Sequence, residues 1–137
     1  MFKFKSNVYI KVIYDRKDSA IARIAPGDID WDAVFDGADW FHFTGITPAL
    51  SAGAAEETAK AVRAAKAHGV TVSCDLNYRK NLWSREEAGR VMGELVPMVD
   101  VLIANEEDAA DVFGIHAAGT DIYAGKLDVE GYRSVAS

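Results

Sequence analysis

The chain has 137 residues, of which 50% are hydrophobic and 26% are charged, a composition typical of one soluble globular domain. Its net charge of −6 argues against a nucleic-acid-binding surface, although a few local Arg and Lys residues can still bind a small anion. No apolar run approaches the roughly 20 residues of a membrane span. The single cysteine, Cys74, excludes an internal disulfide and is expected to be a small buried residue. Because the start, MFKFKSN, contains no apolar signal-peptide core, we expect a cytoplasmic protein.

The first predicted element is a β-hairpin over residues 8–25. The segment VYIKVIY is rich in β-forming residues, residues 15–18 are charged, and residues 19–25 alternate in hydrophobicity. Pro26 and Gly27 end the second strand. We expect residues 1–27 to form a lid hairpin that projects from the sheet and exposes an apolar face to a partner subunit or to another part of a longer chain.

Three strands alternate with helices in residues 28–137. Short β-rich runs alternate with segments whose apolar residues follow helical spacing. Ser51, Ser84 and Asn105 are the predicted N-caps, and Gly69 and Gly114 follow two of the helix ends. This alternation, with its short connections, predicts an α/β fold with a Rossmann-like parallel sheet. The expected strands are residues 39–46, 70–76 and 99–104, and the expected helices are residues 31–35, 51–68, 84–96, 105–113 and 128–137.

Polar clusters follow each of the three predicted strands, at residues 44–47, 75–79 and 105–108. The carboxyl ends of parallel strands meet at one edge of the sheet, and ligands of open α/β sheets bind at that edge. We therefore expect the three clusters to line one crevice. The most informative segment is VTVSCDLNYRKNLW, residues 70–83, in which an apolar strand turns abruptly into an acid, an amide and a guanidinium.

Three residues of this segment are candidates for the site, Arg79 and Asn77 for binding an anion and Asp75 for a supporting role, and each also has a structural interpretation. The planar guanidinium of Arg79 suits a carboxylate or a phosphate, or else it is a surface arginine paired with an acid. Asn77 suits a phosphate or a ribose, or else it bonds its own backbone as a turn residue. Asp75 is expected to brace Arg79 rather than to contact a metal-bound water.

The other candidates lie outside this segment. Asn105 and Asp108 are explained by helix capping, or else they help to hold a magnesium ion near nucleotide phosphates. Tyr14 and Arg16 lie on the predicted hairpin, where exposed turn residues are the simpler interpretation. His42 is expected to be a satisfied core histidine. The sequence contains no P-loop, GxGxxG, CxxC or nucleophile-elbow motif.

Several motifs, in this order and at these intervals, resemble those of the ribokinase-like (PfkB-type) carbohydrate kinases, and most closely the branch that phosphorylates 2-keto-3-deoxygluconate. The resemblance spans roughly residues 11–137. The matching residues are Tyr14-Asp15-Arg16 with Ser19-Ala20, the segment DWFHFTGITP at residues 39–48, the segment DLNYRK at residues 75–80 with Leu82-Trp83, and Asn105-Glu106-Glu107.

The resemblance implies a sugar kinase whose active site is the crevice expected above. In such a kinase Tyr14 and Arg16 would hold the keto-acid substrate from the lid, and the backbone of Ile46 would contact the sugar acid. Arg79 would be the catalytic residue, binding the substrate on its carboxylate side and lying close to the transferring phosphoryl group.

The resemblance also implies ATP and magnesium as cofactors. Asn77 and Tyr78 would lie near the nucleotide, and Asn105 and Asp108 would organise magnesium through water. The chain departs from the family here, because Asp108 occupies the fourth position of the family's Asn-x-x-Glu pattern, and Asp is shorter than Glu.

Two family features are absent from the sequence, namely the N-terminal glycine-rich sugar site and the C-terminal Gly-Ala-Gly-Asp loop that supplies the base and the anion hole. Residues 1–10 also do not match the family. Since phosphoryl transfer depends on positioning and charge stabilisation, we expect residues 28–137 to be part of the core domain of a longer kinase and to be inactive alone. The rival interpretation is a non-catalytic binding or dimerisation module that associates through its hairpin. The sequence leaves open the gluconate or galactonate epimer as substrate and the oligomeric state, for which a homo-oligomer is expected.

Overall fold

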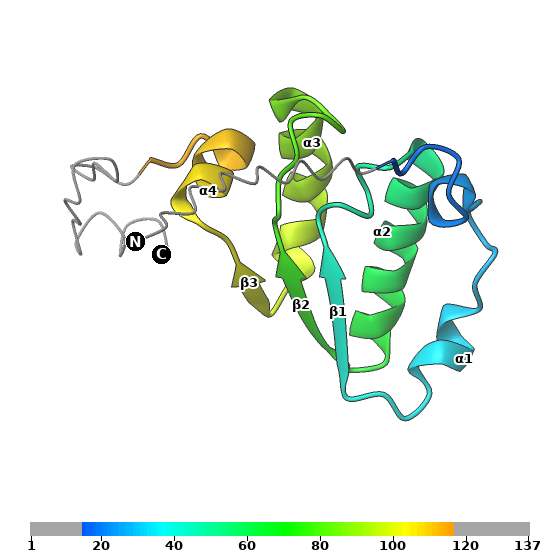
Figure 1. Ribbon diagram of the computed structural model, residues 1–137. Helices are drawn as coiled ribbons and strands as arrows, with labels where there is room; N and C mark the ends of the chain where they lie inside the picture. Colours follow the sequence, from blue (N-terminus) through cyan, green and yellow to red (C-terminus); the bar gives the residue numbers. More distant parts are fainter. Residues whose placement is uncertain (1–14, 117–137) are drawn as a thin grey trace, which may run out of the picture.

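The computed structural model describes residues 15–116 and shows a three-stranded sheet packed against helices (Figure 1). The strands β1 (Trp40–Thr44), β2 (Thr71–Asp75) and β3 (Val101–Ile103) are parallel and lie in the order β1-β2-β3. The helices α2 (Ala52–Ala67) and α3 (Arg85–Leu95) connect them, and α4 (Glu106–Phe113) follows β3. The short helix α1 (Trp31–Phe35) precedes β1, and a 3₁₀ turn, η2 (Val96–Met98), follows α3. The predicted parallel α/β sheet is confirmed, although each strand is shorter than expected.

The helix boundaries follow from local capping chemistry. Ser51 Oγ accepts a hydrogen bond from Ala54 N, and Ser84 Oγ accepts one from Glu87 N, at 3.1 Å in both cases. Such caps satisfy amide groups that have no partner within the helix. After α2 the chain turns at Gly69, whose φ of 73° lies in the left-handed region that glycine adopts without strain. The predicted caps and helix ends are therefore confirmed.

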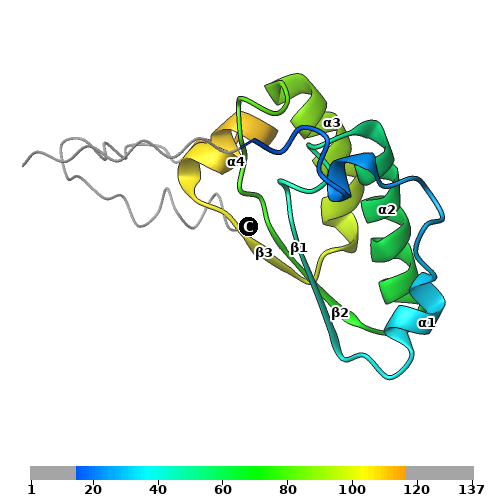
Figure 2. The same ribbon diagram turned by 45° about the vertical axis from the view of Figure 1, so that its right-hand side comes forward.

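The core lies between one face of the sheet and the helices α2 and α3, which run side by side along that face in both views (Figure 2). Residues of β1 and β2 that point to the helices pair in register, as Phe41 with Val72 and Phe43 with Cys74. The thiol of Cys74 is fully buried, as predicted, and burial together with the negative charge of Asp75 raises its pKa to about 12. The other buried core residues include Val62, Ala65, Val70, Leu76, Ala88, Val91, Met92 and Leu95.

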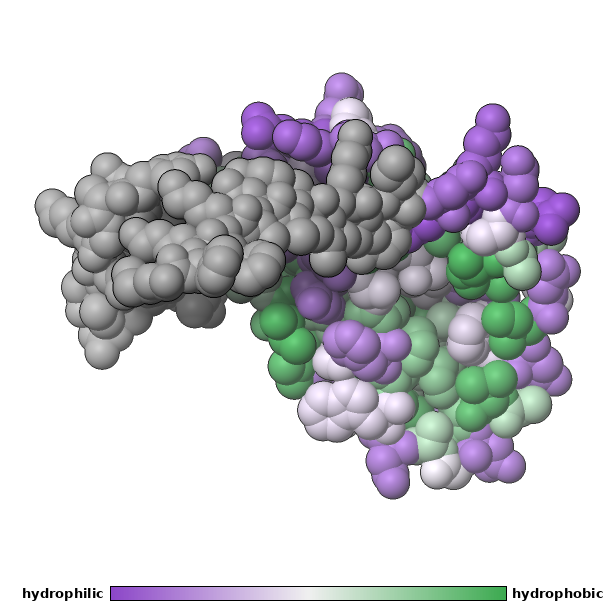
Figure 3. All heavy atoms as spheres, in the orientation of Figure 1, coloured by the Kyte–Doolittle hydropathy of each residue, from purple (hydrophilic) through white to green (hydrophobic). Residues whose placement is uncertain are grey.

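The opposite face of the sheet carries exposed apolar residues. Trp40 is 58% exposed and Ile103 is 52% exposed, and apolar side chains are visible over β3 and again near α1 (Figure 3). His42 also belongs to this face, so the expectation of a core histidine is wrong. Its Nδ1 lies 2.8 Å from Ser73 Oγ, which also accepts a hydrogen bond from Trp40 Nε1 at 2.8 Å. The apolar neighbours of His42 in the sequence suggested burial, but the strand alternation places it away from the helices.

The predicted hairpin is not confirmed. Its first strand, residues 8–14, lies outside the described residues, and the expected second strand, residues 19–25, contains the 3₁₀ helix η1 (Ile21–Arg23). Ser19 curls this segment, because its Oγ donates to Arg16 O at 2.9 Å and accepts from Ala22 N at 3.3 Å. Both faces of residues 19–25 are apolar, so the sequence pattern could not distinguish a strand from a turn whose apolar residues pack on α2. The helix expected at residues 128–137 also lies outside the described residues.

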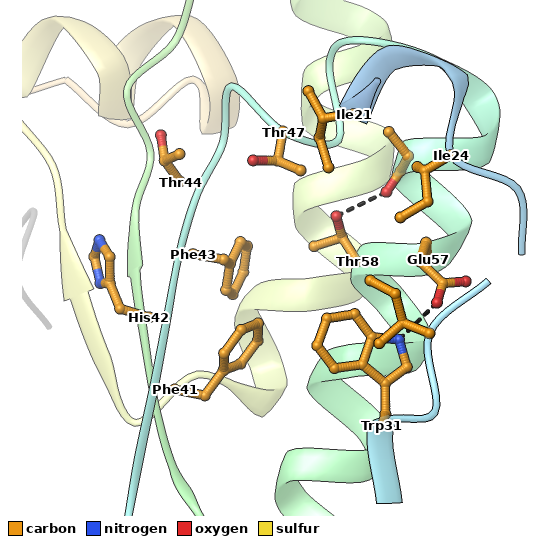
Figure 4. Close-up of a pocket in the computed structure, with 12 residues that line it drawn as sticks. Ile21, Ile24, Trp31, Phe41, His42, Phe43, Thr44, Thr47, Glu57 and Thr58 are labelled. Carbon is orange, nitrogen blue, oxygen red and sulfur yellow. Dashed lines mark hydrogen bonds between the residues drawn. The ribbon is translucent and has the colours of Figure 1, made fainter. Parts of the chain in front are cut away.

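A buried glutamate ties the segment before β1 to α2. Glu57 is 2% exposed, and its two carboxylate oxygens accept hydrogen bonds from Gly27 N at 2.8 Å and from Trp31 Nε1 at 2.7 Å. It borders an apolar cavity of about 240 Å³ between β1, α2 and η1, where Phe41 and Phe43 point toward the helix while His42 points away (Figure 4). Buried carboxylates require such hydrogen bonds. Glu57 therefore fixes the approach of the chain to β1.

Candidate functional site

The carboxyl ends of the three strands are joined into one edge by backbone hydrogen bonds. Gly45 N donates to Asp75 O at 2.8 Å, and Leu76 N donates to Ile103 O at 2.9 Å. These bonds continue the sheet by one residue beyond β1 and β2. The loops that leave this edge therefore start from a common rigid platform, as the parallel topology requires.

The loop after β2 is held in an irregular conformation by its own side chains. Asn77 has a φ of 40°, in the left-handed region, and its Nδ2 donates to Thr44 Oγ1 at 3.3 Å. Asparagine tolerates this conformation better than most residues. Tyr78 is buried, and its hydroxyl donates to Trp83 O at 3.3 Å. Asn77 thus has a structural contact, and its predicted contact with a nucleotide stays a prediction.

Arg79 lies in a cavity of about 300 Å³ between this loop and α4. Its Nη1 donates to Tyr78 O at 2.9 Å, which leaves other guanidinium donors for a ligand. No hydrogen bond or ion pair joins Arg79 to Asp75 within residues 15–116, so the expected brace is not seen there. The cavity is lined by Tyr78, Arg79, Lys80, Asn81, Asn105, Glu107, Asp108 and Asp111. It brings together four of the site residues proposed from the sequence.

Asn105 and Asp108 form the capped start of α4 and also line the cavity that contains Arg79. Asn105 Oδ1 accepts a hydrogen bond from Asp108 N at 2.7 Å, which caps α4. Asp108 is only 9% exposed, and this burial raises the pKa of its carboxyl, opposed by a hydrogen bond from the Tyr78 backbone and by the charge of Arg79. The Asp108 carboxylate therefore links α4 to the loop that carries Arg79.

The donor set of this cavity is suited to magnesium held through water. Asn105, Glu107 and Asp108 provide carboxamide and carboxylate oxygens, the ligand type that magnesium prefers, and magnesium usually keeps several of its waters. Within residues 15–116, no group of three or more histidine, cysteine, aspartate or glutamate side chains is placed to hold a metal ion directly.

A second cavity of about 300 Å³ lies beside the first and contains Arg16. It is lined by Asp15, Arg16, Lys17, Ala49, Leu50, Asn81 and Leu82. Three of these residues precede η1, two follow β1 and two follow β2. Segments that are far apart in the sequence therefore converge here. Tyr14, proposed from the sequence as a neighbour of Arg16 in the site, lies outside the described residues.

Ile46 lies in the turn after β1, and both of its backbone polar groups have partners within that turn. Ile46 N donates to Thr44 Oγ1 at 3.3 Å, and Ile46 O accepts from Ala49 N at 3.2 Å. A carbonyl has two lone pairs, so its oxygen can still accept a second bond from a ligand. Substrate contact by the Ile46 backbone stays a prediction, and the carbonyl is the group that can make it.

The sequence did not single out Asn81, which lines both cavities. Lys80 is exposed to solvent and also lines the first cavity. The only available signal for Asn81 was its position two residues after Arg79 in the loop that follows the central strand. No helix among the described residues is long and apolar enough to cross a membrane.

The family comparison is decisive for the class of protein. Residues 5–128 match the model described as pfkB family carbohydrate kinase, so the expectation that residues 1–10 lie outside the family is wrong for residues 5–10. The chain belongs to this family. A 2-dehydro-3-deoxygalactonokinase from Haloferax volcanii is 44% identical over 97 residues, which cover 71% of this chain and 30% of the relative. A 2-dehydro-3-deoxygluconokinase from Thermoproteus tenax is 36% identical over 107 residues, which cover 77% of this chain and 31% of the relative.

The same fold is found in a solved structure. The crystal structure of a 2-dehydro-3-deoxygluconokinase from Thermotoga maritima superposes with a TM-score of 0.82 and 48% identity, over 92% of this chain and 36% of that one. The chain therefore spans about a third of the length of these relatives.

Proposed function

We propose that this PfkB-family chain is the part of an ATP-dependent 2-keto-3-deoxygluconate kinase that binds both substrates at one sheet edge. The observation that carries the proposal is the convergence of Tyr78, Arg79, Asn105 and Asp108 on one cavity. The names of the relatives support a 2-keto-3-deoxy sugar acid as substrate, with the gluconate and galactonate epimers both represented. The cytoplasm, where ATP is available, is the proposed compartment.

Arg79 has the central role in this proposal. Its guanidinium lies at the carboxyl end of the central strand and retains free donors toward the cavity. A planar fork of donors can bind a carboxylate or phosphate in two places, and it stabilises charge that spreads over a phosphoryl group during transfer. Arg79 would thus orient the sugar acid and stabilise the transition state. Arg16 would bind the acid from the neighbouring cavity, together with Tyr14.

The acidic wall of the cavity would face the nucleotide. Asn105 and Asp108 would hold water molecules of a magnesium ion, and Asn77 and Tyr78 would flank the nucleotide from the opposite loop. Bound magnesium would neutralise the charge of the ATP phosphates. The Asp108 carboxylate accepts a hydrogen bond from the Tyr78 backbone, which would preorganise it for this role. The base and anion-hole residues of the family are not in this sequence, and the complete reaction is proposed for the full-length product of the gene.

The test is steady-state kinetics on that full-length product, with the keto acid and ATP varied separately. A lost charge-assisted hydrogen bond costs about 1.5–3 kcal/mol, so Arg79→Ala should reduce kcat/KM by about one to two decades, and Arg79→Lys should remain impaired because it lacks the fork. Arg16→Ala should act mainly on the KM for the keto acid. Arg63→Ala, which removes an exposed arginine of α2 outside both cavities, is the matched control. Kinetics of Arg79→Ala within about twofold of the wild type would show that Arg79 is a surface arginine.

The exposed apolar surface supports a second candidate, a non-catalytic binding or dimerisation module. Trp40, Val101 and Ile103 are exposed on the sheet, and Ile21 of η1, within the segment 1–27 that was expected to mediate association, is exposed as well. Apolar surface of this kind is typical of interaction sites. Concentration-dependent dimers in sedimentation velocity, with no phosphorylation of either epimer, would favour the module over the kinase.

A further inference from the structure

Asn81 occupies the boundary between the two cavities of the candidate site. It lines the cavity that contains Arg79 and Asp108, and it also lines the cavity that contains Arg16. The backbone bond from Leu82 N to Arg79 O, at 2.9 Å, closes the turn on which Asn81 lies. The position of Asn81 is therefore fixed relative to Arg79.

The carboxamide of Asn81 is available to a ligand, in contrast to those of the two other asparagines at this edge. Asn77 donates to Thr44, and Asn105 caps α4. The Asn81 side chain is exposed and makes no hydrogen bond to another residue in the described range 15–116. An amide that can donate two hydrogen bonds and accept two is well suited to a hydroxyl group, which also donates and accepts.

The charges on either side of Asn81 are suited to the two ends of a phosphorylated sugar acid. On one side, Arg16 and Lys17 outnumber Asp15, which favours a carboxylate. On the other side, Arg79 lies opposite the acidic end of α4, which is suited to a phosphoryl group and its metal ion. A sugar acid that extends from one cavity to the other would place the hydroxyl groups of its middle carbons at Asn81.

We propose that Asn81 is a specificity-determining residue that recognises a hydroxyl group in the middle of the sugar-acid chain. The proposal rests on the kinase function proposed above and deepens it. The gluconate and galactonate forms of 2-keto-3-deoxy sugar acids differ in the configuration of one such hydroxyl. The carboxylate and the phosphorylated end are the same in both, so neither Arg16 nor Arg79 can distinguish the epimers, whereas Asn81 can.

The test measures kcat/KM for both epimers with the full-length product of the gene. For the wild type we expect a clear preference for one epimer. Asn81→Ala should lower kcat/KM for the preferred epimer by about three- to tenfold, the range that one neutral hydrogen bond supplies, and should leave the other within about twofold. Asn81→Ser, which keeps a donor and an acceptor, should retain part of the preference. Lys17→Ala, on the carboxylate side, should lower both values equally.

The outcomes separate this proposal from the proposed function. A preference that is unchanged in Asn81→Ala, equal losses for the two epimers, or a wild type without any preference would each overturn the role of Asn81 while leaving the kinase intact. A wild type that phosphorylates neither epimer would overturn the proposed function itself. A purely structural role of Asn81 would lower both values together and would not move their ratio.

Discussion

Gly45→Ala tests whether the strand ends are packed as closely as the structure shows. A Cβ built on Gly45 would lie 2.1 Å from Leu76 O and 3.1 Å from Leu76 C, both of which are backbone atoms. Neither strand can yield freely, because Gly45 N is bonded to Asp75 O and Leu76 N to Ile103 O. The ends of β1 and β2 would have to separate by roughly 1.3 Å, from 2.1 Å to the 3.4 Å at which ordinary van der Waals contact begins.

The magnitude follows from two contributions. Separation of the strand ends weakens the hydrogen bond from Gly45 N to Asp75 O, which is worth about 0.5–1.5 kcal/mol, and overpacking of a tight site costs about 1–3 kcal/mol. We expect the free energy of unfolding to fall by about 2–4 kcal/mol. The matched control is Gly93→Ala in α3, because a Cβ on Gly93 meets nothing within 4 Å. Alanine in a helix interior is favoured over glycine by about 0.5–1 kcal/mol, so this variant should be more stable than the wild type.

The assay is urea-induced unfolding of the wild type and the two variants, followed by circular dichroism. The same chemical change, glycine to alanine, should shift the unfolding midpoint in opposite directions at the two positions. A free energy of unfolding for Gly45→Ala within about 0.5 kcal/mol of the wild type would show that the strand ends are not in close contact. The common edge of the candidate site would then lose its structural basis.

Two further predictions concern titratable groups. The Cys74 thiol is buried and its pKa is raised to about 12, so an alkylating reagent should label it only after urea is added, and rapid labelling of the native chain would contradict its burial. Lys66 lowers the pKa of Asp100, and a hydrogen bond from Val72 N lowers it further. The Asp100 carboxylate therefore stabilises the fold at any pH above its unfolded-state pKa of about 4. This stabilisation is lost as the pH falls through the lower pKa that Asp100 has in the folded state. Asp100→Asn should therefore be less stable than the wild type near neutral pH, with a difference that shrinks below about pH 4 in urea unfolding; a difference independent of pH would refute the pairing.

The sheet and the helix ends could be predicted because their signals are local. Ser51, Ser84 and Asn105 cap the helices that they were expected to cap, since capping needs only the residue and the next turn. The convergence of Arg79 and Asp108 on one cavity follows from the parallel order of the strands, although their roles in catalysis remain predictions.

Features that depend on tertiary contacts could not be predicted. Glu57, near the start of α2, has the position of an exposed residue that complements the helix dipole. It is buried because Gly27 and Trp31, distant in the sequence, supply its donors. Residues 19–25 form a turn rather than a strand because Ser19 bonds to its neighbours and the apolar residues meet α2. The sequence also could not show that the Asn81 side chain is left without a hydrogen bond among the described residues, because this depends on the contacts that the fold gives to Asn77, Asn81 and Asn105.

The two walls of the candidate site, the loop that carries Arg79 and the helix α4 that carries Asp108, should differ in their resistance to local opening because β2 lies at the centre of the described sheet. β2 has a partner on both sides, and its amides should be among the slowest in the chain to exchange with solvent. The loop of Arg79 continues directly from this strand. Asp108 is carried by α4, which follows β3, a strand of three exposed residues at the edge of the described sheet. Local opening of the crevice should therefore move α4 and Asp108 first, while the guanidinium of Arg79 keeps its position on the central strand.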